Sequence, residues 1–88
     1  MSTQSQTIAA LLNNMERANR KHGPMGGNVK CLGALTLEYF EAMKAIQDRD
    51  DHFVYSELID VATVCIRRCE EILEERRNAG YTYTKLEE

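Results

Sequence analysis

The sequence predicts an all-α protein, an antiparallel bundle of three main helices whose core is completed by oligomerisation. Apolar residues recur at helical spacing in three segments, and a glycine- and proline-containing loop and a short polar run separate those segments. The chain is also only 88 residues long. A chain of this size hides only roughly 60–65% of the surface that its unfolded form exposes, so its own core is thin. We therefore expect one domain over residues 1–88 that relies on a disulfide, a metal or a partner subunit.

The first predicted helix ends before Gly23-Pro24, where glycine favours a C-cap and proline cannot continue the helix. Either Ser5 or Thr7 offers a side-chain oxygen to cap its start. Its apolar residues have the i, i+3, i+4, i+7 spacing of one helical face: Ile8, Leu11, Leu12, Met15 and Ala18. The loop from His22 to Asn28 is the clearest break in the chain.

The second predicted helix runs from about Val29 to Gln47, with Asn28 as its N-cap. Its apolar stripe consists of Val29, Leu32, Thr36, Tyr39, Phe40, Met43 and Ile46. The polar run from Asp48 to Asp51 then turns the chain back. Such a short connection makes the second and third helices antiparallel neighbours.

The third predicted helix runs from about Asp51 to Asn78, and Gly80 stops it. Its predicted core face consists of Leu58, Val61, Ala62, Cys65, Cys69, Ile72 and Leu73. Aromatic and β-branched residues alternate from Tyr81 to Thr84, so residues 79–88 form a candidate C-terminal arm.

Charge and composition argue against several classes of protein. The net charge of −3 disfavours a nucleic-acid partner, which would require a basic patch. No segment is apolar for long enough to predict a leader or a membrane span. Cys31, Cys65 and Cys69 are an odd number of cysteines, and the last two share an apolar helical face. We expect buried thiols, no disulfide framework and a reducing, cytosolic compartment.

Two pairs of acids suggest a metal site. Glu38 and Glu41 lie on the second helix, and Glu57 and Asp60 lie on the third. Each pair is spaced i, i+3, so its side chains leave one face of the helix. Packed helices lie about 8–10 Å apart, so facing pairs would gather four carboxylates that repel one another unless a cation joins them. Carboxylate oxygens suit Mg²⁺ or Mn²⁺, and such a metal supports attack of water on phosphorus. Solvated helix faces with ordinary salt bridges are the alternative reading.

The residues around these acids resemble a known family. The stretches Leu37-Glu38-Tyr39-Phe40-Glu41-Ala42-Met43-Lys44-Ala45-Ile46 and Ser56-Glu57-Leu58-Ile59-Asp60-Val61 resemble the MazG-like all-α nucleoside triphosphate pyrophosphohydrolases, whose pattern is EExxE, a variable gap and ExxD. The resemblance covers about residues 15 to 75. At one position the chain departs from the pattern, because Leu37 stands where the family has the first glutamate of EExxE.

The resemblance implies that Glu38, Glu41, Glu57 and Asp60 bind Mg²⁺ and form the catalytic site. The expected reaction cleaves a nucleoside or deoxynucleoside triphosphate between the α and β phosphates, giving the monophosphate and pyrophosphate. Members of the family assemble as dimers or tetramers, which agrees with the thin core expected for 88 residues.

A triphosphate also needs cations. Arg67 lies nearly in phase with Asp60 on the third helix, and Lys30 and Lys44 lie near the phase of Glu41 on the second, so these three are the predicted substrate-binding residues. Pairing of each base with a nearby surface acid is the alternative. His22 and His52 lie at predicted helix ends, where exposed histidines without a catalytic role are common.

Three functions are compatible with this pattern. The first is a Mg²⁺-dependent nucleotide pyrophosphohydrolase. The second is a catalytically degenerate helical oligomer of the same fold that binds a nucleotide or another protein, which the leucine at position 37 favours. The third is a helical DNA-binding regulator, which the acidic balance disfavours.

Overall fold

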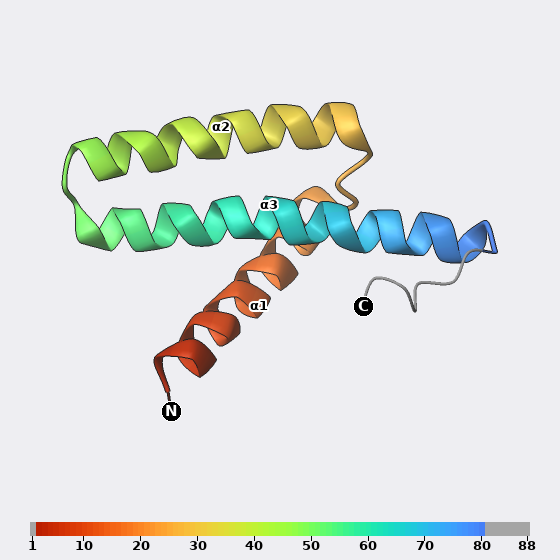
Figure 1. Cartoon of the computed structure of the whole chain (residues 1–88), viewed down its shortest axis with the longest axis horizontal. Helices are drawn as coiled ribbons and strands as arrows, with labels where there is room; N and C mark the ends of the chain where they lie inside the picture. The colour runs from red at the N-terminus through yellow and green to blue at the C-terminus, as the bar shows by residue number, and fades with distance from the viewer. Residues whose placement is uncertain (1, 81–88) are drawn as a thin grey trace, which may run out of the picture.

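A computed structural model of the protein describes residues 2–80 (Figure 1). The described chain folds into three α-helices and contains no strand: α1, Thr3–His22; α2, Asn28–Gln47; and α3, Asp51–Asn78. The prediction of an all-helical fold is therefore confirmed. Of the predicted arm over residues 79–88, only Ala79 and Gly80, which end α3, are described, and the rest lies outside the described residues.

The central element is α3, against which both other helices pack. The turn after Gln47 places α2 and α3 side by side and antiparallel, as predicted, whereas α1 crosses α3 obliquely (Figure 1). Over residues 2–80, α1 and α2 do not pack against each other. The chain is thus a helical hairpin crossed by a third helix.

Two of the three helices begin at caps that differ from the predicted ones. The N-cap of α1 is Ser2, whose Oγ accepts a hydrogen bond from the Ser5 amide at 3.1 Å, so the prediction of Ser5 or Thr7 is wrong. The Thr7 hydroxyl instead donates to the Thr3 carbonyl, inside the first turn. The N-cap of α2 is Gly27 rather than Asn28, because the Asn28 side chain accepts from Arg68 Nε at 2.9 Å on α3.

Contacts with α3 hold the loop between α1 and α2. The amides of Gly26 and Gly27 donate to the two carboxylate oxygens of Glu71, at 2.8 and 3.2 Å. Both glycines have φ near +90°, a conformation that costs little only without a Cβ atom. Arg68 donates to the same carboxylate at 3.0 Å, and these bonds hold the pKa of Glu71 below its usual range, the Gly26 amide contributing most. Glu71 therefore binds the loop as a carboxylate.

The core of the single chain is small. Among the described residues no side chain is completely buried, and the buried apolar residues are Met15, Met25, Ala42, Ala45 and Val64. The apolar stripe of α2 is not part of this core, because Ala42 and Ala45 face α3 and most of the stripe is exposed: Val29, Leu32, Thr36, Tyr39, Phe40 and Ile46. On α3, Leu58 and Leu73 are also exposed.

The cysteines differ from the prediction in the same way. Cys65 and Cys69 are exposed and Cys31 is half-buried, so the expectation of buried thiols is wrong for the single chain. Neither α1 nor α2 therefore buries these two thiols on α3. All three thiols are free. Within residues 2–80, every helix is too short or too polar to cross a lipid bilayer.

Candidate metal and anion site

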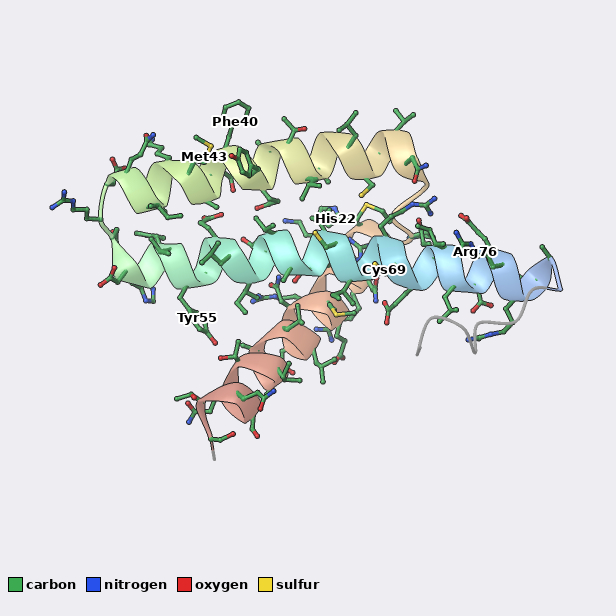
Figure 2. The ribbon with its side chains drawn as sticks, in the orientation of Figure 1. His22, Phe40, Met43, Tyr55, Cys69 and Arg76 are labelled. Atoms are coloured by element: carbon green, nitrogen blue, oxygen red, sulfur yellow. The ribbon has the colours of Figure 1, made fainter. Side chains whose placement is uncertain are left out.

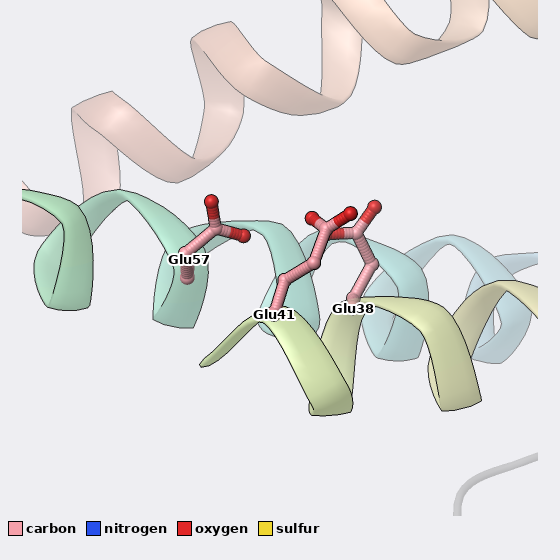
Figure 3. Close-up of side chains that lie close together, drawn as sticks. All are labelled: Glu38, Glu41 and Glu57. Atoms are coloured by element: carbon pink, nitrogen blue, oxygen red, sulfur yellow. The ribbon is translucent and has the colours of Figure 1, made fainter. Parts of the chain in front are cut away.

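Three of the four predicted acids come together between α2 and α3. Glu38 and Glu41 project from α2 toward Glu57 on α3 (Figure 3). One carboxylate oxygen from each residue lies within 4.8 Å of the other two. The i, i+3 spacing on α2 and the antiparallel pairing of α2 with α3 produce this convergence.

The cluster disfavours negative charge on its members. Burial is the main cause that raises the pKa of Glu38 from 4.5 to about 7, followed by repulsion from Asp60, Glu41 and Glu57. A hydrogen bond to Glu41 contributes further, because only a protonated Glu38 can donate it. Burial and the nearby Glu41 carboxylate likewise raise the pKa of Glu57. Without a cation, Glu38 therefore keeps a proton up to about pH 7, and Glu57 keeps one above its usual range.

Two oxygen atoms in the cluster lack any partner. Glu38 Oε2 and Glu57 Oε2 are inaccessible to solvent and, within the described part of the chain, have no hydrogen-bond donor. A buried carboxylate oxygen without a partner costs free energy that a bound cation would recover. The donor set consists of hard oxygen atoms only, which fits Mg²⁺ or Mn²⁺ rather than zinc.

Asp60, the fourth predicted acid, lies beside the cluster and does not join it. Its Oδ1 accepts a hydrogen bond from Asn14 Nδ2 of α1 at 2.9 Å. Its charge still acts on the cluster, since it contributes to the raised pKa of both Glu38 and Glu57. The structure thus places Asp60 at the edge of the three glutamates, on the side of α1.

A pocket of about 710 Å³ adjoins the carboxylates and is lined by all three helices and the α1–α2 loop. This volume is within the range of small-molecule sites, roughly 300–1,000 Å³. Glu38 and Asp60 supply the acidic part of its lining. The basic part of its lining consists of Arg17, Lys21, His22, Lys30 and Arg67, and the apolar part consists of Ala18, Pro24, Met25, Ala34, Leu37 and Val64. The pocket therefore combines acids that suit a cation with bases that suit an anion.

The three basic residues that are predicted to bind substrate lie in different surroundings. Lys30 lines the large pocket as expected. Lys44 lies outside it and borders a smaller pocket of about 310 Å³ together with Glu41 and Glu57. Arg67 lines the large pocket but is only 7% exposed, and its guanidinium donates to Asn19 Oδ1 at 2.9 Å and to the Gly23 carbonyl. Arg67 thus also fixes the end of α1.

The sequence interpretation missed several residues of α1. Asn14 binds Asp60, and Arg17 and Lys21 line the basic side of the pocket. The i, i+4 spacing of Arg17 and Lys21 is visible in the sequence and places both on one face of α1. Only the oblique crossing of α1 over α3 directs that face toward the acids. His22 lines the pocket while remaining exposed, and His52 is exposed at the start of α3 (Figure 2 labels His22).

Comparisons with protein-family models, with curated proteins and with solved structures find no match for this chain.

Proposed function

We propose that this protein is a Mg²⁺-dependent nucleoside triphosphate pyrophosphohydrolase that converts an NTP or dNTP to the monophosphate and pyrophosphate. The observation that carries the proposal is the pocket whose lining includes Glu38 and Asp60 together with basic side chains, beside the cluster that Glu38 forms with Glu41 and Glu57. A triphosphate chelating a divalent cation presents both kinds of partner, the metal to the acids and the phosphates to the bases. The resemblance of residues 37–46 and 56–61 to the MazG-like family supports the same function.

In this proposal Glu38, Glu41 and Glu57 hold Mg²⁺ or Mn²⁺, and Asp60 adds a further carboxylate at the edge of this cluster. The metal, when bound, supplies Lewis-acid polarisation of a phosphate oxygen and a water molecule of lowered pKa. Arg17, Lys21 and Lys30 bind phosphate oxygens, while Arg67 shapes the pocket through its bonds to Asn19 and Gly23. Water adds to the α phosphorus, the bond to the α–β bridging oxygen breaks, and pyrophosphate leaves.

Two alanines leave space beside the acids. Ala34 precedes Glu38 by one turn and lines the large pocket, and Ala45 follows Glu41 by one turn and lines the smaller one. A larger side chain at position 34 would reduce the volume of the pocket. The proposal also includes a homo-oligomer, since the described residues 2–80 bury only five apolar side chains, which is a small core.

A specific observation favours the alternative of a catalytically degenerate nucleotide-binding or protein-interaction module. Leu37 lines the same pocket, is 58% exposed, and stands where the family has a further carboxylate. A leucine there can neither orient water nor bind a second metal ion. Binding of the metal nucleotide without turnover would fit this alternative.

The test is pyrophosphate release by the purified full chain from each NTP and dNTP, with Mg²⁺ or Mn²⁺. Glu41→Gln and Asp60→Asn run alongside, and Glu70→Gln, an exposed acid on α3 away from the cluster, is the control. Release that both site variants lose and the control keeps supports the enzyme. Nucleotide binding without release by the unmodified chain moves the assignment to the binding module. If the protein binds neither metal nor nucleotide, the enzyme and the nucleotide-binding module both fail, and only the protein-interaction module stays.

A further inference from the structure

The smaller pocket, of about 310 Å³, lies between α2 and α3 beside the turn that joins them. Glu41 and Glu57 belong to its lining, whereas Glu38 lines the large pocket. One carboxylate oxygen of each of these three glutamates lies within 4.8 Å of the other two (Figure 3), so the cluster borders both pockets. A ligand held at the cluster can therefore extend into either pocket.

The two pockets lie in opposite directions along α2. Lys30 and Ala34, which line the large pocket, precede Glu38 by two turns and by one turn. Ala45, which lines the smaller pocket, follows Glu41 by one turn. The carboxylate cluster is therefore the point at which the two pockets meet.

The two pockets differ in charge. The large pocket carries the basic side chains that suit phosphates. In the described chain the smaller pocket has a single base, Lys44, and four acids: Glu41, Asp48, Asp50 and Glu57. Carboxylates repel phosphate oxygens but accept hydrogen bonds from hydroxyl and amino groups. The smaller pocket thus suits the uncharged end of a nucleotide, which carries such groups on its sugar and base.

Phe53 gives the smaller pocket an aromatic surface. It lines the pocket, is 55% exposed, and precedes Glu57 by one turn on α3. Within residues 2–80, the only ring that lines the large pocket is the imidazole of His22. A base can stack on an exposed aromatic ring whatever its identity, because every base has a π face. The volume of the smaller pocket is near the lower end of the range for small-molecule sites, which suits part of a nucleotide.

We propose that the smaller pocket binds the nucleoside part of the substrate, with the base stacked on Phe53 and the sugar hydroxyls donating to the surrounding carboxylates. The α phosphate then lies at the cluster of Glu38, Glu41 and Glu57, and the β and γ phosphates extend the opposite way into the large pocket. This inference rests on the proposed function and adds to it a nucleoside site and the direction in which the nucleotide lies.

The first test uses fluorescence, because the chain contains no tryptophan and Phe53→Trp therefore introduces a single reporter. The probes are the α,β-methylene analogues of ATP, GTP, CTP and UTP, whose α–β bridge is a carbon atom that the proposed reaction cannot break, and inorganic tripolyphosphate, all with Mg²⁺. The emission of Phe53→Trp should fall saturably with at least one analogue and stay unchanged with tripolyphosphate, since only the analogues carry a base that can stack on the indole.

Tyr55→Trp is the matched control. Tyr55 is 49% exposed, does not line the smaller pocket, and projects from the side of α3 opposite to α2 (Figure 2). Its emission should not respond to any probe. An equal response of Phe53→Trp to tripolyphosphate, or no response to an analogue that calorimetry shows to bind, overturns the proposal.

The second test is isothermal titration calorimetry with the same probes. Phe53→Ala should weaken binding of the best analogue about tenfold, the loss expected for one stacked base, and leave binding of tripolyphosphate unchanged. Phe53→Tyr keeps an aromatic ring and should bind like the unmodified chain. Lys30→Ala, in the large pocket, should instead weaken binding of both kinds of probe.

The outcomes separate this inference from the proposed function. If Phe53→Ala weakens both kinds of probe alike, or neither, the nucleoside site is overturned while the triphosphate site stands. The same holds if the unmodified chain binds every analogue no more tightly than tripolyphosphate. If the unmodified chain binds none of the probes, the proposed function and this inference fail together.

Discussion

Asn14 connects α1 to the acidic edge of the pocket: its Nδ2 donates to Asp60 Oδ1 at 2.9 Å and to Thr63 Oγ1 at 2.7 Å. The amide oxygen of Asn14 accepts from Arg17 at 2.6 Å. One side chain therefore holds an acid and a base of the same pocket in fixed positions. An apolar residue in place of Asp60 or Arg17 would leave a polar group of the Asn14 amide without that hydrogen-bond partner.

Asn14→Ala is expected to lower the free energy of unfolding by about 1–3 kcal/mol, because it removes two part-buried hydrogen bonds and leaves Asp60 without its donor. Chemical denaturation followed by circular dichroism measures the change. Asn13→Ala, at the exposed neighbouring position, is the control and should change stability by less than about 0.5 kcal/mol. Equal effects of the two substitutions would contradict the role assigned to Asn14.

The raised pKa of Glu38 predicts how stability depends on pH. The folded, metal-free protein keeps a proton on Glu38 up to about pH 7, whereas the unfolded chain releases it near 4.5. The folded state binds more protons in this interval, so the free energy of unfolding should fall as pH rises from 4.5 to 7 and level off above it. Glu57, whose pKa is also raised, adds a slope of the same sign.

Thermal melts of the metal-free protein across this interval, with Glu38→Gln alongside, test the prediction. The variant should show a shallower decline, since glutamine neither ionises nor repels Glu41, Glu57 and Asp60. Saturating Mg²⁺ or Mn²⁺ should reverse the slope, because metal binding requires deprotonated carboxylates. A decline that is equally steep in Glu38→Gln and the unmodified protein would place the titrating group elsewhere.

The basic part of the pocket should determine affinity for phosphates. Lys21→Ala and Lys30→Ala are each expected to weaken binding of inorganic tripolyphosphate about tenfold, the equivalent of one charge-assisted hydrogen bond. Isothermal titration calorimetry provides the measurement. Arg20→Ala is the matched control on α1, because Arg20 is exposed, pairs with Glu16 and does not line the pocket. If all three variants weaken binding alike, net charge rather than the pocket accounts for it.

Arg67→Lys should destabilise the fold although it keeps the charge. The buried guanidinium donates to Asn19 and to the Gly23 carbonyl at the same time, and an ammonium group on a shorter side chain cannot reproduce both bonds. We expect a loss of about 2–3 kcal/mol in the free energy of unfolding. Arg77→Lys, at an exposed ion pair with Glu74, is the control and should change it little. A comparable loss in both variants would contradict the structural role of Arg67.

Local sequence signals were sufficient for the helices. Gly23-Pro24 and the polar run after Gln47 interrupt the apolar periodicity, and the structure ends α1 and α2 at those points. The convergence of Glu38, Glu41 and Glu57 follows from i, i+3 spacing combined with antiparallel pairing, so the sequence could also predict it. Which metal binds and what reaction follows stay predictions.

The contacts that the sequence could not predict depend on the direction of α1 relative to α3. Periodicity identifies an apolar face but not the element that covers it, and most of the apolar stripe of α2 is exposed in the single chain. The crossing angle of α1 over α3 likewise decides that Asn14 meets Asp60, and that Arg17 and Lys21 line the pocket. That angle depends on contacts between distant residues, such as Arg67 with Gly23 and Glu71 with Gly26.

Over residues 2–80, α1 packs against α3 but not against α2. The attachment of α1 and the pairing of α2 with α3 can therefore differ in local stability. Detachment of α1 from α3 would remove Asn14, Arg17 and Lys21 from the pocket while leaving Glu38, Glu41 and Glu57 in place on the hairpin. Partial unfolding confined to α1 would thus weaken recognition of an anion, leaving Lys30 as the remaining phosphate-binding residue, without dispersing the carboxylates. Evolutionary or engineered changes along the α1–α3 contact can therefore tune one property of the site and leave the other unchanged.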